Sequence, residues 1–273
     1  MHAEKDIRDF PDAKNSRSME DSRSDVIAGR NAVMEALRSG REIDRLLVAH
    51  GASGGSLTPI IAKCSQRGIL IKEVSSQKLD ALCCGVNHQG VALMAAVHTY
   101  CQVEDILHLA EERGESPFLV ICDEIEDPHN LGAIIRTAEA CGVHGIVIPK
   151  RRSASLNATV AKSASGALEY MKVARVTNLT AAIDQLKEKG VWIFGAHMEG
   201  ESWCSQSYSG PTALVIGSEG RGIGKRVASH CDLLVSLPMR GRINSLNASV
   251  AAGVLMYEAA RQRAAIPALQ PKR

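Results

Sequence analysis

The apolar positions of the chain have no regular spacing over residues 1–24, where Asp, Glu, Lys, Arg and Ser dominate. This composition predicts a disordered leader. From residue 25 the spacing becomes regular, and Val33, Ala36 and Leu37 fall on one face of an expected helix. Helices are expected at 25–40, 57–68 and 76–85, and strands at 43–50, 69–75 and 90–100. The pattern predicts a complete, smaller α/β unit over residues 25–100.

The same alternation starts again after residues 101–116, a segment expected to join the two units as linker and helix. Strands are expected at 118–125, 145–150, 171–177, 191–198, 212–220 and 231–239, and helices at 131–142, 156–167, 179–190, 224–230 and 247–263. Short apolar strands that alternate with helices predict a mostly parallel sheet with helices on both faces. This second unit is expected to span residues 117–263, and residues 264–273 to form a tail.

The composition limits the classes of function. The chain has 273 residues, of which 45% are hydrophobic and 23% charged, so it has ample material for a core. A formal net charge of +2 is too small to indicate a general nucleic-acid binder, and any RNA site must come from local clusters of charge. Only 3% of the residues are aromatic, which argues against base stacking as the main mode of binding.

Eight cysteines are scattered without C-x-x-C spacing, and the N-terminal stretch MHAEKDIRDF has no apolar signal segment. We therefore expect reduced thiols, no metal site and a cytoplasmic location. No stretch approaches the roughly 20 apolar residues that a membrane-spanning helix needs.

Three polar stretches follow predicted strands of the second unit, where ligands of open parallel sheets bind. In the first, Pro128 biases Asp127 towards extended geometry, and Asn130 suits the N-cap of the next helix. Arg136 lies six residues after Asn130, inside that helix. Taken alone, this stretch indicates a capped helix with a surface arginine.

The second stretch is a loop with four glycines between residues 217 and 224, whose backbone amides could face a ligand. It contains neither G-x-G-x-x-G nor G-x-x-x-x-G-K-[ST], which argues against a nicotinamide oxidoreductase and against a phosphate-binding loop. Glu219 lies in the middle of the loop and would repel phosphate. The expected ligand is not a polyphosphate.

The third stretch is PMRGRINSLNASVAAG, residues 238–253. Ser245 or Asn247 suits a helix cap, and the small residues from Ala248 to Gly253 would let another backbone approach the helix closely. Taken alone, an ordinary strand–turn–helix connection explains this stretch equally well.

Together, and in this order, the three stretches resemble the SpoU/TrmH family of RNA ribose 2′-O-methyltransferases in the SPOUT superfamily. The matching pieces are Asn130-x-Gly132-x-x-x-Arg136, IGSEGRGI, LPMRGRINSLNASVAAG and, between them, KSASGALEY. The first unit, with GRNAVMEAL and NHQGVAL, resembles the family's auxiliary RNA substrate-binding domain. The best-fitting subgroup modifies a guanosine of large-subunit (23S) rRNA.

The resemblance implies a trefoil knot, in which the C-terminal segment is threaded through a preceding loop. Such threading is exceptional among folds. It also implies a pocket for S-adenosylmethionine that is built largely from main-chain groups, with no metal. Carried over by motif, the cofactor contacts are Gly195, Ala196, Ile216, Gly217, Leu237, Met239, Ser245 and Leu246.

The implied reaction is methyl transfer to a ribose 2′-hydroxyl. Arg136 is expected to bind the phosphate of the target nucleotide and to orient the hydroxyl, because a guanidinium with a pKa above ~12 is a poor base. The proton would pass to that phosphate, to Glu219 or to water. Asn130, Ser245 and Asn247 are expected to serve the ribose, the cofactor carboxylate and the shape of the loops, with simple helix capping as the alternative for the two asparagines.

RNA contacts are expected from basic residues beside the site and, in the first unit, from polar residues of the two matching stretches; a solvated charged face is the alternative. These candidates are Lys150, Arg151, Arg152, Arg221, Arg240 and Arg242, and then Arg30, His88 and Gln89. The resemblance also implies a homodimer through the catalytic domain. The last helix could contribute its apolar residues to that interface, with burial within the monomer as the alternative; these residues are Val250, Val254, Leu255 and Ala259. A tRNA guanosine 2′-O-methyltransferase and a non-catalytic RNA-binding or assembly protein that keeps the knot stay open as alternatives.

Overall fold

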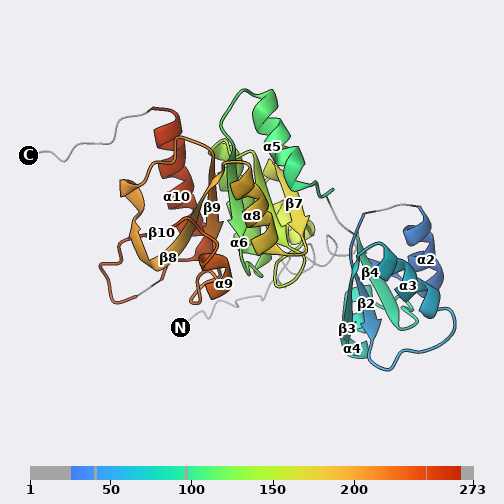
Figure 1. Cartoon of the computed structure of the whole chain (residues 1–273). Helices are drawn as coiled ribbons and strands as arrows, with labels where there is room; N and C mark the ends of the chain where they lie inside the picture. Colours follow the sequence, from blue (N-terminus) through green and yellow to red (C-terminus); the bar gives the residue numbers. More distant parts are fainter. Residues whose placement is uncertain (1–25, 40–41, 96–97, 244, 266–273) are drawn as a thin grey trace, which may run out of the picture. The chain divides into compact units, whose positions relative to one another are not determined.

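The computed structural model describes residues 26–39, 42–95, 98–243 and 245–265, and the chain divides into two compact units at residues 96 and 97 (Figure 1). In the first unit the strands are β1 (Val26–Ala28), β2 (Ile43–Ala49), β3 (Leu70–Val74) and β4 (Val91–Ala95), and the helices are α2 (Arg30–Arg38), α3 (Thr58–Gln66) and α4 (Ser76–Cys83). The sheet order is β1-β4-β2-β3. β2 and β3 are parallel, whereas β4 is antiparallel to both of its neighbours.

Strand β1 was not predicted, because its three residues were assigned to the start of the helix that follows. Its pairing with β4 is made across about 65 residues of sequence, which a local pattern does not show: Ile27 lies opposite Leu93. Gly29, with φ of 93°, turns the chain from β1 into α2. A Cβ at this position would also lie 3.3 Å from the carbonyl oxygen of Asn87, so glycine suits the turn on both counts.

The second unit has one six-stranded sheet of order β10-β8-β9-β5-β6-β7, in which every pairing is parallel. Its strands are β5 (Phe118–Cys122), β6 (Gly145–Pro149), β7 (Lys172–Val176), β8 (Trp192–Ser202), β9 (Thr212–Ile216) and β10 (Leu233–Ser236). Its helices are α5 (Val103–Glu112), α6 (Pro128–Ala140), α7 (Ala158–Ala164), α8 (Leu179–Glu188), α9 (Lys225–Ala228) and α10 (Ala248–Arg263), with short 3-10 turns at Ala167–Glu169 and Trp203–Ser205.

The central strands are apolar on both sides because helices cover both faces of the sheet. On one face, Phe118 and Val120 of β5 belong to a core that includes residues of α6, α7 and α10. On the other face, Leu119 and Ile121 pack with residues of α5, α8 and α9. The predicted α/β fold with a mostly parallel sheet is confirmed; the threading of the C-terminal segment stays a prediction.

The segment expected to connect the units forms part of the second one. Val103 and Ile106 of α5 are buried in its core, and Cys101 forms a parallel bridge with Ala174 of β7. Gly145 at the start of β6 makes this packing possible, since a Cβ there would lie 2.6 Å from the side chain of Ile106.

Helix α6 begins three residues earlier than predicted, and its N-cap is Asp127 rather than Asn130. The carboxylate of Asp127 accepts the backbone N–H of His129 at 2.9 Å, and Pro128 occupies the first helical position, where its missing N–H costs nothing. Asn130 therefore lies in the first turn of the helix with its side chain available for other partners.

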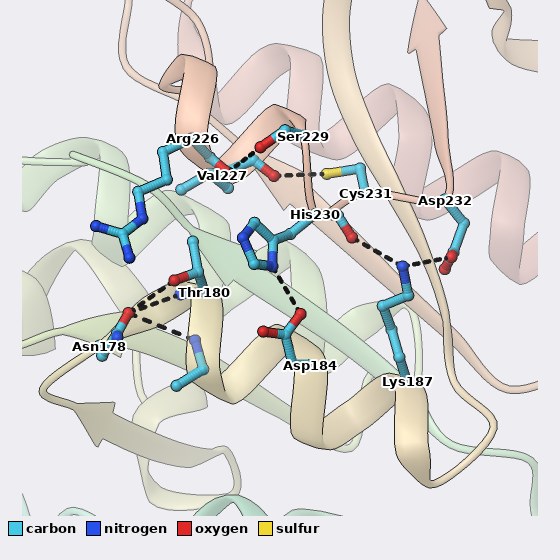
Figure 2. Close-up of polar contacts among 11 residues, drawn as sticks. Asn178, Thr180, Asp184, Lys187, Arg226, Val227, Ser229, His230, Cys231 and Asp232 are labelled. Atoms are coloured by element: carbon cyan, nitrogen blue, oxygen red, sulfur yellow. Dashed lines mark hydrogen bonds and ion pairs between the residues drawn. The ribbon is translucent and has the colours of Figure 1, made fainter.

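Helix α8 is tied to the segment that joins α9 to β10 (Figure 2). His230 Nδ1 lies 2.6 Å from Asp184 Oδ1, and Lys187 Nζ lies 2.8 Å from Asp232 Oδ1. The other carboxylate oxygen of Asp232 accepts the backbone N–H of Ile193 at 2.8 Å. These contacts fix the start of β10, whose other end leads into the functional site. In the part of the chain that the structure describes, no helix is both long enough and apolar enough to cross a membrane.

Candidate active site

A pocket lies at the carboxyl ends of β9 and β10 and beside the middle of β8, near the edge at which open parallel sheets bind ligands. The start of α10 contributes Ala248 and Ala251 to its wall. The other lining residues are Ala196, His197, Met198, Ile216, Gly217, Ser218, Gly220, Arg221, Gly222, Val235, Leu237, Met239, Ser245 and Leu246.

Of the eight residues predicted to contact the cofactor, all but Gly195 line this pocket. Gly195 is buried one residue before the lining begins. A Cβ at Gly195 would come within 2.9 Å of the side chains of Ile223, Cys231 and Leu234, so this glycine serves the packing beneath the pocket. Two lining residues that the motifs did not indicate, His197 and Met198, belong to β8, which continues past its predicted end.

The glycine loop is folded back on itself. Ser218 and Gly222 exchange two backbone hydrogen bonds, of 3.1 and 2.9 Å, and Gly220 and Gly222 have positive φ angles of 79° and 66°. At Gly217 the backbones touch so closely that a Cβ would lie 2.0 Å from the carbonyl carbon of Gly222. Close approach therefore requires glycine at position 217, and backbone conformation favours it at positions 220 and 222.

A polar network joins α6, the glycine loop and the start of α10. Glu219 Oε1 accepts hydrogen bonds from Asn130 Nδ2 at 3.0 Å, from Asn247 Nδ2, and from the backbone N–H of Ala248 at 3.4 Å. Asn247 Nδ2 also donates to Asn130 Oδ1 at 2.9 Å. Glu219 itself does not line the pocket. Its negative charge lies at the N-terminus of α10, where the helix dipole favours an anion.

Arg136 lies on α6 and is exposed, and its Nη1 donates to Ser165 Oγ at 3.2 Å. Ser165 ends α7 in left-handed conformation. The two helices pack closely at Gly132, where a Cβ would lie 2.4 Å from Cβ of Ser163. The stretch KSASGALEY thus supplies both the contact surface for α6 and a hydrogen-bond partner for Arg136.

The basic residues predicted to contact RNA in this unit differ in their surroundings. Arg152 lies 2.6 Å from Glu124, and Arg221 lies 3.9 Å from the same carboxylate. The Glu124 carboxylate raises the pKa of the Arg152 guanidinium. Lys150 is half-buried at the end of β6, whereas Arg151, Arg240 and Arg242 are exposed.

The candidates in the first unit are occupied by contacts within that unit. The guanidinium of Arg30 donates to Gln89 O, Ser56 Oγ and Ser53 O, and Gln89 Oε1 accepts the backbone N–H of Arg30. His88 Nε2 lies 3.0 Å from Asp80 Oδ1, while its Nδ1 accepts the backbone N–H of Gly90. These side chains shape two neighbouring loops.

Two acidic residues at the exit of β5 were not predicted. Asp123 is buried, and its Oδ2 accepts the backbone N–H of Gly224 at 2.8 Å; burial raises the pKa of this carboxyl. Glu124 follows it and binds the arginines described above. The one feature of the sequence that could have indicated these two residues is their position directly after an apolar strand. Among the described residues, no group of three or more His, Cys, Asp and Glu side chains is placed to hold a metal ion.

Comparisons with known proteins agree with this geometry. The SpoU rRNA Methylase family matches residues 117–257, and the family of RNA 2′-O ribose methyltransferase substrate-binding domains matches residues 26–101. The chain is 48% identical over 240 residues to the putative TrmH family tRNA/rRNA methyltransferase YacO of Bacillus subtilis (strain 168), covering 88% of this chain and 96% of the relative. A putative TrmH family tRNA/rRNA methyltransferase of Staphylococcus aureus (strain MSSA476) is 42% identical over 246 residues, covering 90% of this chain and 98% of the relative.

Solved structures show the same fold. An AdoMet-bound rRNA methyltransferase from Sinorhizobium meliloti is similar with a TM-score of 0.56 and 26% identity, covering 91% of this chain and 96% of that one. The SpoU methyltransferase AviRb from Streptomyces viridochromogenes, in complex with AdoMet, has a TM-score of 0.56 and 23% identity, covering 93% and 95%. The matched families, the order of the two matched units and the pocket at the strand ends lead to one conclusion: this chain belongs to the SpoU rRNA methylase family.

Proposed function

We propose that the chain transfers a methyl group from S-adenosylmethionine to a ribose 2′-hydroxyl of RNA, with a guanosine of 23S rRNA as the target. The observation that carries this proposal is the convergence on one pocket of residues from the glycine loop, from the stretch that leads into α10 and from β8, namely Gly217, Leu246 and Ala196 among others. A solved structure of the same fold is an AdoMet-bound rRNA methyltransferase, which supports the choice of methyl donor.

The chemistry of the pocket suits S-adenosylmethionine. Leu237, Met239 and Leu246 present apolar surface for an adenine ring, and the glycine loop presents backbone groups for polar atoms. No phosphate-binding motif is present, in keeping with a ligand that carries a sulfonium instead of phosphates. Ala196, Ile216, Gly217, Leu237, Met239, Ser245 and Leu246 are the residues that would hold it.

When bound, S-adenosylmethionine supplies a methyl group already activated for displacement, so the protein has to position the reactants and manage one proton. Arg136 binds the phosphate of the target nucleotide and orients its 2′-hydroxyl through the planar guanidinium. The network of Asn130, Glu219 and Asn247 holds the glycine loop and α10 in register at the edge of the pocket. Ser245 lines the pocket and provides a hydroxyl for the polar end of the cofactor.

The proton released by the 2′-hydroxyl goes to the nucleotide phosphate or to water in this proposal. Glu219 is the third candidate, but three donors converge on its Oε1, and it does not line the pocket. Its arrangement favours a role in shaping the site.

The first unit supports RNA as the substrate, because it matches the family of RNA 2′-O ribose methyltransferase substrate-binding domains and precedes the methylase domain in the chain. Basic residues of the second unit, Arg151, Arg240 and Arg242, are exposed and suit phosphate contacts. A homodimer is supported by apolar side chains exposed along α10, namely Val250, Val254 and Tyr257. In the proposed knot, the C-terminal segment would be threaded through a preceding loop.

A methylation assay with radiolabelled S-adenosylmethionine tests the proposal. We expect label in 23S rRNA at one ribose, resolved by nuclease digestion as an alkali-resistant 2′-O-methyl dinucleotide, and none with Arg136→Ala. Label in tRNA alone would overturn the choice of substrate. Calorimetric titration separates the donor from other nucleotides: saturable binding of S-adenosylmethionine and none of NAD is expected, and the reverse would overturn the whole proposal.

A further inference from the structure

Three consecutive residues at the exit of β5 each bind a neighbouring loop. The carboxylate of Asp123 accepts the backbone N–H of Gly224 at 2.8 Å, at the end of the glycine loop. The carbonyl of Ile125 accepts the backbone N–H of Ala154 at 2.8 Å, in the loop between β6 and α7. Glu124 lies between Asp123 and Ile125 and takes part in neither hydrogen bond.

The carboxylate of Glu124 binds one arginine from each of the two loops. Its Oε1 lies 2.6 Å from Arg152 Nη1, and its Oε2 lies 3.9 Å from Arg221 Nη1. The Glu124 side chain is 24% exposed, whereas those of Arg152 and Arg221 are 74% and 86% exposed. The carboxylate is thus largely covered while both guanidiniums face solvent, and Arg221 also lines the pocket.

The backbone at this point is unusual. Glu124 has φ of 56° and Arg152 has φ of 55°, in the left-handed region that side chains other than Gly, Asn and Asp rarely adopt. Such conformations persist where the surrounding contacts over-determine them, and they cluster at functional sites. Here both partners of the shortest ion pair in the cluster have this conformation, so the pair is formed by two constrained loops rather than by two free side chains.

We propose that Glu124 is a positioning residue for RNA, which holds Arg152 and Arg221 together at the edge of the pocket so that both meet one stretch of the phosphodiester backbone. This inference rests on the proposed function, because it needs RNA as the ligand. Pre-arranged guanidiniums lose less side-chain freedom on binding phosphate. The cost of this arrangement is a negative charge beside the RNA, which by itself would weaken binding.

The two effects of Glu124 have opposite signs, which makes the inference testable. If Glu124 only repels RNA, Glu124→Gln tightens RNA binding. If Glu124 positions the arginines, the same isosteric change weakens it even though the net charge becomes more positive. Glu126→Gln is the matched control, since Glu126 is exposed two residues away and is close enough to act on the charge of Arg152.

Filter binding with a 23S rRNA fragment measures the outcome without requiring turnover. We expect Glu124→Gln to raise the Kd for RNA by about threefold to tenfold, with the Kd for S-adenosylmethionine unchanged. Glu126→Gln should leave RNA binding unchanged or slightly tighter. In a double-mutant cycle, adding Glu124→Gln to Arg152→Ala should weaken binding less than it does in the unmodified chain, because part of its effect passes through Arg152.

RNA binding by Glu124→Gln that equals or exceeds that of Glu126→Gln would overturn the inference, as would strictly additive effects in the cycle. These results leave the proposed function intact if the unmodified chain still methylates RNA. An unmodified chain that neither binds nor methylates RNA would instead overturn the proposed function, and the inference with it.

Discussion

The side-chain amide of Asn247 donates a hydrogen bond of 2.9 Å to Oδ1 of Asn130, a residue 117 positions earlier in the chain. The other end of the same amide caps α10, since Asn247 Oδ1 accepts the backbone N–H groups of Ser249 and Val250 at 3.0 and 3.3 Å. The sequence left two alternative roles for Asn247: capping the last helix, or shaping the loops of the active site. For Asn247 they are one arrangement, because the acceptor end of the amide starts the helix and the donor end joins the network of Glu219.

Replacing Asn247 with Ala should therefore reduce stability and activity together. Loss of a helix cap costs about 1 kcal/mol, and loss of the network should lower kcat by more than tenfold by releasing the glycine loop. Asn178→Ala is the matched control, since Asn178 caps α8 by accepting the N–H groups of Thr180 and Ala181 away from the pocket (Figure 2). Urea unfolding should show that both variants lose a similar amount of stability. Methylation kinetics should show full activity for Asn178→Ala and reduced activity for Asn247→Ala.

Arg136→Lys tests the planar guanidinium. Lysine keeps the positive charge but loses the fork of donors, so kcat should fall by at least about tenfold, or ~1.4 kcal/mol of transition-state free energy. The Kd for S-adenosylmethionine should not change, because Arg136 does not line the pocket. Full activity of the lysine variant would show that charge alone suffices.

Much of the fold could be predicted because its strands are apolar runs of five or so residues separated by helical patterns. Every predicted strand of the second unit is present, and β5 with its five buried residues is the clearest case. The antiparallel strand β1 and the exact start of α6 were missed. Both depend on contacts that local spacing does not encode, namely pairing with β4 and capping by Asp127.

The pocket was predictable through motifs, and the electrostatic details were not. Seven of the eight residues predicted to contact the cofactor line the pocket, whereas Gly195 lies one residue before the lining begins and packs closely against Ile223, Cys231 and Leu234. Arg152 and Arg221 were predicted to contact RNA, but their pairing with Glu124 was not predicted. These two ion pairs join three different loops and depend on the fold that brings the strand ends together, so the sequence alone could not show them.

Gly217→Ala tests whether close backbone approach shapes the pocket. The added Cβ would lie 2.0 Å from the carbonyl carbon of Gly222, too short for any relaxation of side chains to relieve. We expect the glycine loop to open and binding of S-adenosylmethionine to weaken by more than about tenfold, or 1.4 kcal/mol. Gly210→Ala is the control, because its Cβ would meet nothing within 4 Å. Isothermal titration calorimetry of both variants with S-adenosylmethionine measures the two Kd values. Binding by Gly217→Ala that is as tight as in the unmodified chain would show that close approach at Gly217 does not shape the pocket.

His144 should make the second unit less stable in mild acid. Its ring is fully buried, Nδ1 accepts the backbone N–H of Phe118 at 3.0 Å, and burial lowers its pKa below the ordinary 6.5 in spite of the opposing effect of Glu115. Below pH 6.5 the unfolded chain gains a proton that the folded chain does not yet bind. The free energy of unfolding should therefore fall with pH, by at most about 1.4 kcal/mol per unit, until the pH reaches the lower folded pKa.

Urea unfolding at several pH values measures this slope, and both tryptophans, Trp192 and Trp203, report on the second unit. His144→Asn keeps an acceptor for the N–H of Phe118 and cannot titrate, so part of the slope should disappear. His108→Asn, at an exposed position of α5, should retain the slope. Equal slopes in all three proteins would show that His144 is not responsible.

The exposed apolar side chains of α10 predict an interface between two copies of the chain. Val250, Val254 and Tyr257 are 50%, 36% and 58% exposed and recur at a spacing that places them on one side of the helix. Leu255 and Ala259, the other apolar candidates on this helix, are buried within the monomer and leave the interface to these three. Burying such a stripe against its own copy would remove its apolar surface from water.

Val254→Glu should convert the dimer to a monomer, because a carboxylate in the centre of the stripe would face its symmetry mate without a partner. Glutamate favours helix at least as well as valine, so α10 itself should stay folded. Sedimentation velocity should give twice the chain mass of 29.2 kDa for the unmodified protein and the single mass for the variant. Val86→Glu, at an exposed apolar position of the first unit, should remain dimeric. A dimeric Val254→Glu would place the interface on another surface, and a monomeric unmodified chain would contradict the dimer itself.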